Sequence, residues 1–119
     1  MSARAIHRNA PVSPRKARLV ADMIRRKKVE EAQDILEFNP QRAAYLIGRL
    51  LRSAAANAAE LNANDNWRGG EDLDESNLYV KRIVVDDGLR FKRMRPRARG
   101  MAYGILRRRC HITLELDDR

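Results

Sequence analysis

Residues 88–109 read GLRFKRMRPRARGMAYGILRRR, and the predicted architecture follows from this segment and its two neighbours. It contains nine Lys and Arg residues and no acid. The segment before it, from Leu78 to Val85, is rich in Val, Ile and Tyr, and the segment after it alternates apolar residues with polar ones from Cys110 to Leu116. Both flanking patterns are typical of β-strands. We therefore predict an antiparallel pair within a globular body of residues 1–87 and 110–119, with 88–109 as an extended hairpin.

The hairpin is too long to lie on its own body. If Val85 lies opposite Cys110, the turn falls near Arg97 and Ala98, and each arm of about eleven residues spans roughly 35 Å. A compact domain of this size has a radius of gyration of about 13 Å. Both faces of the outgoing arm carry cations, so neither is a core face. The hairpin should project, and an isolated hairpin of like charges needs a partner to become ordered.

Folded RNA is the partner that this pattern favours. RNA can surround a ribbon and neutralise cations on two sides, whereas duplex DNA would occupy one side. A solvated, floppy loop is the alternative interpretation. It is disfavoured by the number of apolar residues within the segment, which exceeds that of a plain linker. These residues are Phe91, Met94, Met101, Tyr103, Ile105 and Leu106.

Three helices are predicted before the hairpin. Ser13-Pro14 is typical of a helix start, and apolar residues recur at helical spacing to about Arg26. A short amphipathic helix follows over Val29–Phe38, and a longer one from Asn39-Pro40 to about residue 61. The cations of residues 25–28 fall at the C-terminal end of the first helix, where they complement its dipole and can also contact RNA.

Residues 62–77 are predicted to form a loop, since they combine glycines with acids. Trp67 lies within it and is more often a local anchor than a base-stacking platform in such a setting. The chain is therefore expected to be a single α+β domain over residues 1–119. Its architecture is a small three-helix body packed on an antiparallel sheet, with a long protruding basic β-hairpin.

Charge is sorted along the chain. The 119 residues include 25 Lys and Arg against 16 Asp and Glu, a net charge of +9. Residues 1–28 carry a net +8, residues 29–87 a net −6 and residues 88–109 a net +9. On a surface that only has to be soluble, positive and negative side chains are usually interspersed. Two cationic regions around an acidic middle therefore indicate an oriented surface for a polyanion.

Other classes of protein fit the sequence poorly. The N-terminal residues have no apolar run, which argues against a signal peptide or membrane anchor, and no stretch is apolar enough to span a bilayer. A single cysteine, Cys110, precludes an intrachain disulfide, disfavours a zinc site and fits a reducing, cytoplasmic setting. Its place in an alternating strand predicts a core thiol.

Catalysis is not expected either. His7 and His111 are the only histidines, and no glycine-rich phosphate loop or apolar acid pair is present. His111 is expected to be a surface hydrogen-bonding group. A DNA-binding protein is the second alternative, but it should have a dimer seam or a recognition helix. The nearest candidate helix, at residues 14–26, has cations that continue into a loop.

Three ordered motifs resemble one family over nearly the whole chain. They are Arg15-Lys16-Ala17-Arg18-Leu19-Val20-Ala21-Asp22 with Arg25 to Val29, then Ser53-Ala54-Ala55-Ala56-Asn57-Ala58, and finally Arg95-Pro96-Arg97-Ala98-Arg99-Gly100 followed by His111-Ile112-Thr113. Together they resemble the bacterial large-subunit ribosomal protein twenty-two family (universal family uL twenty-two). The resemblance implies a structural constituent of the large ribosomal subunit, in the cytoplasm, that binds 23S-type rRNA and supports subunit assembly.

The resemblance also implies partners. The hairpin would line the nascent-polypeptide exit tunnel, with its tip facing ribosomal protein four at the constriction and contacting the nascent polypeptide. Neighbouring large-subunit ribosomal proteins are further implied partners, whereas no cofactor, metal, membrane or homo-oligomer is implied. The loop at residues 62–77 is longer than the family pattern, and Met101-Ala102-Tyr103-Gly104 replaces a return arm that usually starts with a basic residue. The role of Trp67 and the returning contacts of the tip therefore stay open.

The candidate site has two parts. The rRNA-binding residues are expected to be Arg4, His7, Arg8, Arg15, Lys16, Arg18, Arg25, Arg26, Lys27, Lys28, Arg90, Lys92, Arg93, Arg95, Arg97, Arg99, Arg107, Arg108 and Arg109. The tunnel-wall tip is expected to be Met94, Arg95, Pro96, Arg97, Ala98, Arg99 and Gly100.

Overall fold

The computed structural model describes residues 2–64 and 72–118. The elements follow in the order β1 (Ala3–Ala10), α1 (Pro14–Ile24), α2 (Val29–Phe38), α3 (Arg42–Ala63), the 3-10 turn η2 (Glu75–Asn77), β2 (Tyr79–Pro96), the 3-10 turn η3 (Ala98–Gly100) and β3 (Ala102–Asp117). The predicted α+β class, with three helices and a long hairpin, is confirmed. Trp67 lies outside the described residues.

The sheet has three antiparallel strands in the order β1-β3-β2. The central strand β3 buries Cys110, Ile112, Leu114 and Leu116 completely, as the alternating pattern predicted. Burial raises the pKa of the Cys110 thiol, which agrees with its predicted role in the core. The edge strand β1 was not predicted, because its buried positions are alanines, whose small side chains give a weak hydrophobic signal.

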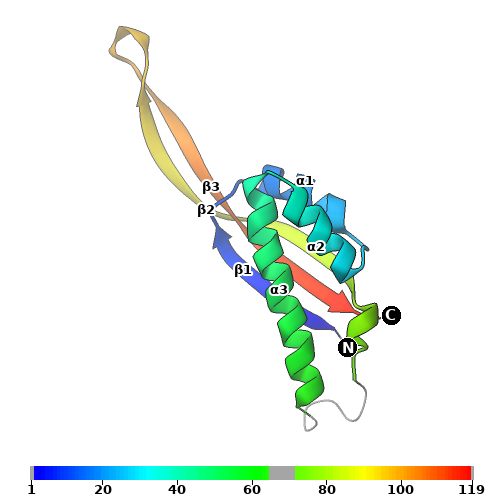
Figure 1. Cartoon of the computed structure of the whole chain (residues 1–119). Coiled ribbons are helices and arrows are strands. Elements are labelled where there is room, and N and C mark those ends of the chain that lie inside the picture. The colour runs from blue at the N-terminus through cyan, green and yellow to red at the C-terminus, as the bar shows by residue number, and fades with distance from the viewer. Residues whose placement is uncertain (1, 65–71, 119) are drawn as a thin grey trace.

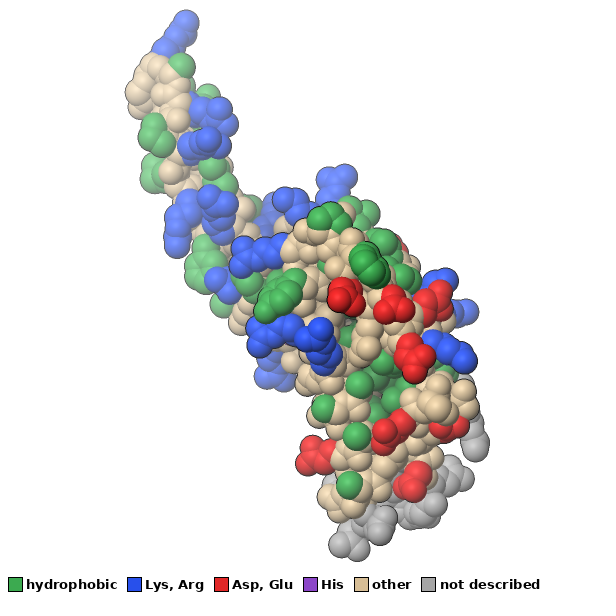
Figure 2. Space-filling model, in the orientation of Figure 1, with side chains coloured by type: hydrophobic (Ala, Val, Ile, Leu, Met, Phe, Trp, Pro, Cys, Tyr) green, Lys and Arg blue, Asp and Glu red, His purple; other side chains and the backbone are tan. Residues whose placement is uncertain are grey.

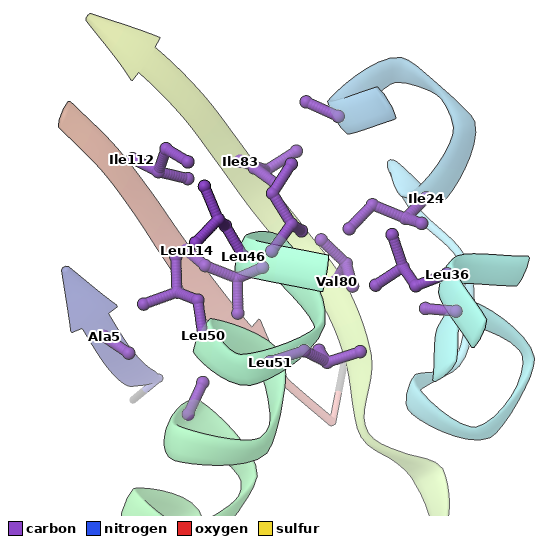
Figure 3. Packing of buried hydrophobic residues seen from close by; sticks show 14 of the residues in the cluster. Ala5, Ile24, Leu36, Leu46, Leu50, Leu51, Val80, Ile83, Ile112 and Leu114 are labelled. Carbon is purple, nitrogen blue, oxygen red and sulfur yellow. The ribbon is translucent and has the colours of Figure 1, made fainter. Parts of the chain in front are cut away.

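The helices cover one face of this sheet (Figure 1). α3 packs against β1 and β3, and α1 packs against β2. Figure 3 shows Leu50 and Leu51 of α3 beside Leu114 and Val80 of the sheet, with Ile24 at the end of α1 completing the cluster. No residue of 88–109 belongs to this core. The body is therefore closed without help from the hairpin.

The boundaries of the helices differ from the prediction at two places. α1 ends at Ile24, and Arg26 takes a left-handed φ of 62°. The Arg26 N–H donates to the Val80 carbonyl at 3.0 Å, and the Val80 N–H donates to the Lys27 carbonyl at 2.9 Å. The cations of residues 25–28 thus follow the last turn of α1, with Arg25 as its C-cap residue, and run beside β2. Their predicted interaction with the dipole of α1 stays a prediction.

α3 begins at Arg42, later than the predicted start at Asn39-Pro40. The Asn39 side-chain oxygen accepts a hydrogen bond from the Gln41 N–H at 2.9 Å, so this pair forms a turn ahead of the helix. At its other end α3 extends into the predicted loop. The Asn62 side chain bonds both the N–H and the carbonyl of Leu73, each at 2.8 Å, and so ties the chain that leads to β2 onto α3.

Beyond the body, β2 and β3 continue as a two-stranded ribbon (Figure 1). The molecule measures 68 × 29 × 16 Å and has a radius of gyration of 17.8 Å, well above the value of about 13 Å for a compact domain of this size. The predicted projection is confirmed. β1 begins and β3 ends at the far end of the body from the ribbon.

The predicted register of the ribbon was wrong by two residues. Val85 pairs with Ile112, not with Cys110, and the last pair before the turn is Pro96 with Ala102. Arg99 and Gly100 both have left-handed φ angles, so the turn lies around Arg99 rather than at residues 97 and 98. Both faces of the ribbon are charged, so no hydrophobic pattern fixed the register in the sequence.

A bulge marks the base of the ribbon. Between Asp87 and Arg90 the outgoing strand contains one residue more than its partner does. Gly88 lies in this bulge, and a Cβ atom there would come within 3.0 Å of the Arg109 carbonyl group. The close approach of the two strands therefore requires glycine at this position.

Candidate nucleic-acid interface

The ribbon exposes cations on both faces, as Figure 2 shows for one side. All of its Lys and Arg side chains are exposed except Arg109, which is half-buried. The register sets Arg90 directly opposite Arg108, an arrangement of like charges that destabilises a strand pair. Within the described residues, the ribbon takes part in one ion pair, in which the Arg90 guanidinium lies 3.8 Å from the Asp87 carboxylate. The ribbon therefore needs counter-charge from outside the chain.

The tip mixes these cations with exposed apolar side chains. Met94 is 78% exposed, and Met101 and Tyr103 on the return arm are more than half exposed. The Arg97 guanidinium lies 5.9 Å from the centre of the Tyr103 ring, within the range of a cation–π contact. The return arm thus supports the tip through an aromatic residue, where the family pattern suggested a cation.

A groove of about 810 Å³ lies at the base of the ribbon. The β1–β3 ladder ends at the Ala10–Cys110 pair, so beyond it the edge of β3 is no longer covered by β1. We call this space the base groove; six of its lining residues are basic and none is acidic. The lining comprises Pro11, Val12, Ser13, Lys16, Arg42, Phe91, Arg93, Leu106, Arg107, Arg108 and Arg109.

Two helices begin at the base groove. α1 starts at Pro14, directly after Ser13, and α3 starts at Arg42. Neither N-cap residue, Ser13 or Gln41, makes a side-chain capping hydrogen bond. Helix N-termini carry partial positive charge and favour anions. The two termini add to the cationic side chains and make this groove a strong candidate anion site.

The fold brings together only part of the predicted set of rRNA-binding residues. Lys16 of the N-terminal region joins Arg93, Arg107, Arg108 and Arg109 of the ribbon at the base groove. Arg42 joins them as well, and sequence analysis missed it because it stands alone at the start of α3 in the acidic middle of the chain. The remaining N-terminal cations lie on β1, on α1 and on the segment after it. These are Arg4, His7 and Arg8, then Arg15 and Arg18, then Arg25, Arg26, Lys27 and Lys28.

Several of these cations already have partners within the chain. Arg25 forms an ion pair with Asp22 and donates to the Ile83 carbonyl at 3.2 Å. Lys27 lies 3.7 Å from Glu31. The Arg109 guanidinium donates to the Asn9 carbonyl at 3.1 Å and lies 5.4 Å from the centre of the Phe91 ring. These contacts fix the positions of the three side chains. Each guanidinium has five N–H donors, so most donors of Arg25 and Arg109 are still available to a ligand.

A family model described as Ribosomal protein L22p/L17e matches residues 5–117. The chain belongs to this family. Similar proteins named "Large ribosomal subunit protein uL22" occur in Desulforamulus reducens, at 47% identity, and in Thermus thermophilus, at 45%; each alignment covers 100% of this chain and 97% of the relative. A third, from Thermomicrobium roseum, is 48% identical over 99% of this chain and 92% of the relative. The predicted resemblance is confirmed.

Membership in the L22p/L17e family makes the chain a structural constituent of the large ribosomal subunit, and the family is not one of enzymes.

The described residues contain no group of His, Cys, Asp and Glu that could hold a metal ion. His111 accepts a hydrogen bond at Nδ1 from the Asn9 N–H at 3.0 Å, so its predicted hydrogen-bonding role is confirmed, but the side chain is half-buried and not on the open surface. No helix in the described part of the chain is long and apolar enough to cross a membrane.

The L22p/L17e body also has a side that disfavours nucleic acid. α2 carries Glu30, Glu31, Asp34 and Glu37 and no basic residue. A second groove of about 430 Å³ between α2 and α3 is lined by two acids, Asp34 and Glu37, and by three arginines, Arg42, Arg49 and Arg52. Acidic side chains gather on this part of the body in Figure 2, away from the ribbon. The four carboxylates of α2 would repel an RNA backbone, so the fold gives the protein one cationic end and an acidic side along α2.

Proposed function

We propose that this protein binds 23S-type rRNA through its ribbon and the base groove, and that it thereby supports assembly of the large subunit. The observation that carries the proposal is the ribbon itself. It has nine cations, no acid and no core face, and it projects from a body that is complete without it. Cations that release counterions from phosphates provide most of the affinity in such complexes.

The tip of the ribbon is proposed to line the nascent-polypeptide exit tunnel. Residues 94–100 lie farthest from the body, and the exposed Met94 stands among the arginines. Cationic heads can bind rRNA phosphates while the apolar groups offer a surface to a passing chain. In this arrangement the tip faces ribosomal protein four at the tunnel constriction and contacts the nascent polypeptide. The length of the ribbon supports the proposal, because it separates the tip from the anchoring cations of the body.

The acidic side of the body is proposed to face neighbouring ribosomal proteins. Phe38 at the end of α2 is 85% exposed, and Tyr45 on α3 is 66% exposed. An exposed aromatic group such as Phe38, on a helix with four carboxylates, suits a basic protein surface better than a phosphate backbone. The Tyr45 ring lies beside a cation instead, since the Arg49 guanidinium is 5.9 Å from the ring centre.

Salt dependence of rRNA binding tests the proposal. If about six cations engage phosphates, the logarithm of the association constant should fall against the logarithm of salt concentration with a slope of roughly −4 to −5. Replacing Arg90, Lys92 and Arg93 with Gln should flatten this slope by roughly 2 to 2.5, since each lost phosphate contact removes about 0.7 to 0.9 of a unit. The binding constants are measured by filter binding or fluorescence anisotropy over a range of salt.

A matched control removes the same charge elsewhere. Arg49, Arg52 and Arg82 are exposed cations outside both the ribbon and the base groove. Their replacement with Gln also lowers the net charge by three, but it should leave the slope unchanged. An unchanged slope in the ribbon variant would place the rRNA interface elsewhere, on residues 1–28.

A further inference from the structure

The base groove contains more than a phosphate site requires. Its cations and the two helix N-termini account for an anion, yet Phe91 and Leu106 also line it, and these side chains are 39% and 40% exposed. Exposed apolar groups inside a cationic groove are costly in water and gain free energy only if the ligand has an apolar surface to cover them. The ligand of this groove therefore needs both negative charge and a flat or apolar face.

The side chains around Phe91 indicate which kind of flat face the ligand has. The guanidinium carbons of Arg109 and Arg93 lie 5.4 Å and 5.8 Å from the centre of its ring. Aromatic rings and guanidinium planes are the two protein surfaces on which unstacked nucleobases stack. The base groove thus places a stacking surface among six basic side chains.

The size of the groove favours one nucleotide over a helix. A volume of about 810 Å³ lies within the range of about 300–1,000 Å³ typical of small-molecule sites. A paired base in a duplex has both faces covered by its neighbours and cannot offer one to Phe91. Only a base that has left the stack can enter.

We propose that the base groove binds an unpaired nucleotide of the rRNA. The base stacks on Phe91 beside Leu106, and the adjoining phosphates contact Lys16, Arg42 and Arg107. This inference rests on the proposed rRNA binding and adds a nucleotide-specific site to it. The groove then recognises the shape of the RNA, since it distinguishes a bulged or junction nucleotide from continuous duplex.

The test compares two short RNA duplexes of the same sequence, one of them carrying a single bulged 2-aminopurine. The full-length protein should bind the bulged RNA about tenfold more tightly, because stacking of one base on an aromatic side chain strengthens binding by at least this order. The 2-aminopurine fluorescence should be quenched on binding. Phe91→Ala should abolish both the preference and the quenching, and Phe91→Trp should retain them.

Phe38→Ala is the matched control. Phe38 is more exposed than Phe91 but lies on α2, outside the base groove, so its removal should leave both RNAs bound as before. Lys16→Gln with Arg107→Gln should weaken the binding of both RNAs, because phosphates are present in each.

The outcomes separate this inference from the proposed function. If both RNAs bind equally, or if Phe91→Ala keeps the preference, the nucleotide site does not exist although rRNA binding stands. If an acidic peptide displaces the bulged RNA as well as a single-stranded RNA does, the groove selects carboxylates and the inference is wrong. If neither RNA binds, both proposals fall together.

Discussion

The Arg18 guanidinium donates two hydrogen bonds to the Val85 carbonyl, from Nε at 3.3 Å and from Nη2 at 3.0 Å. Val85 is buried and precedes the bulge at the base of the ribbon. The same guanidinium lies 3.8 Å from the Asp87 carboxylate. Arg18 was predicted to bind rRNA, and that remains a prediction. The structure gives it a role within the chain, which is to join α1 to the strand that leads into the ribbon.

Arg18→Gln should loosen the base of the ribbon. The substitution removes charge-assisted hydrogen bonds to a partly buried carbonyl, and we expect a loss of about 1–2 kcal/mol in the free energy of unfolding. Amide exchange should accelerate in residues 86–91 while α3 keeps its protection. Arg18→Lys, which keeps the charge but not the paired donors, should be intermediate. Equal exchange in all three proteins would show that the contact does not stabilise the ribbon.

The ribbon should be mobile in the free protein. It has no core face, and Arg90 repels Arg108 across the strand pair. Amide exchange should show strong protection in α3 and little between Arg90 and Leu106 until rRNA is added. Strong protection of the ribbon in the free monomer would mean that strand pairing alone is sufficient to order it.

Removal of the tip should separate anchoring from tunnel function. Because Met94 pairs with Gly104, deletion of the tip, residues 94–100, also has to include residues 101–104 of the return arm to keep the strands in register, and an Asn-Gly turn after Arg93 then closes the ribbon. The base groove and the N-terminal cations remain, so incorporation into the large subunit should stay nearly normal. A cryo-electron microscopy map should show the body in place and an altered tunnel wall. Absence of the shortened protein from mature subunits, or an unchanged tunnel, would contradict this division of roles.

The pair Lys81–Asp117 should make stability depend on pH. Burial alone raises the pKa of Asp117, but hydrogen bonds from Lys81, at 3.1 Å, and from the Asp118 N–H outweigh this effect, so that the pKa lies below its usual 3.8. Because the folded pKa is lowered, the stabilisation is present above pH 3.8 and is lost as pH falls through the folded value. The same hydrogen bond raises the pKa of Lys81, so its contribution is lost only above pH 10.5.

Asp117→Asn should therefore lower the free energy of unfolding by about 1 kcal/mol at pH 7, measured by urea denaturation. The difference from the unsubstituted protein should shrink as the pH falls below 3.8. Asp86→Asn, at an exposed position, is a control that should lower the free energy of unfolding by less. A difference that stays constant down to low pH would show that loss of packing, not of charge, is the cause.

The sequence by itself determined the elements whose pattern is local. The alternation of apolar and polar residues from Cys110 to Leu116 correctly predicted which side chains of β3 face the core. The Ser13-Pro14 start and the apolar residues at helical spacing after it correctly predicted α1. The sorting of charge in residues 88–109 specified a ribbon without a core face, because a run of cations cannot be buried without partners. Ordered motifs along nearly the whole chain were enough to indicate the family.

The register of the ribbon, the edge strand β1 and the composition of the base groove depend on contacts between segments that are distant in the sequence. The register depends on a bulge at Gly88, which side-chain alternation cannot reveal in a segment charged on both faces. The groove joins Lys16, Arg42 and Arg107, which are far apart in the sequence, and the structure also assigns Arg18 to a contact within the chain. The sequence pattern of a segment indicates which secondary structure it can form. Where its side chains end up depends on which distant segments pack against it.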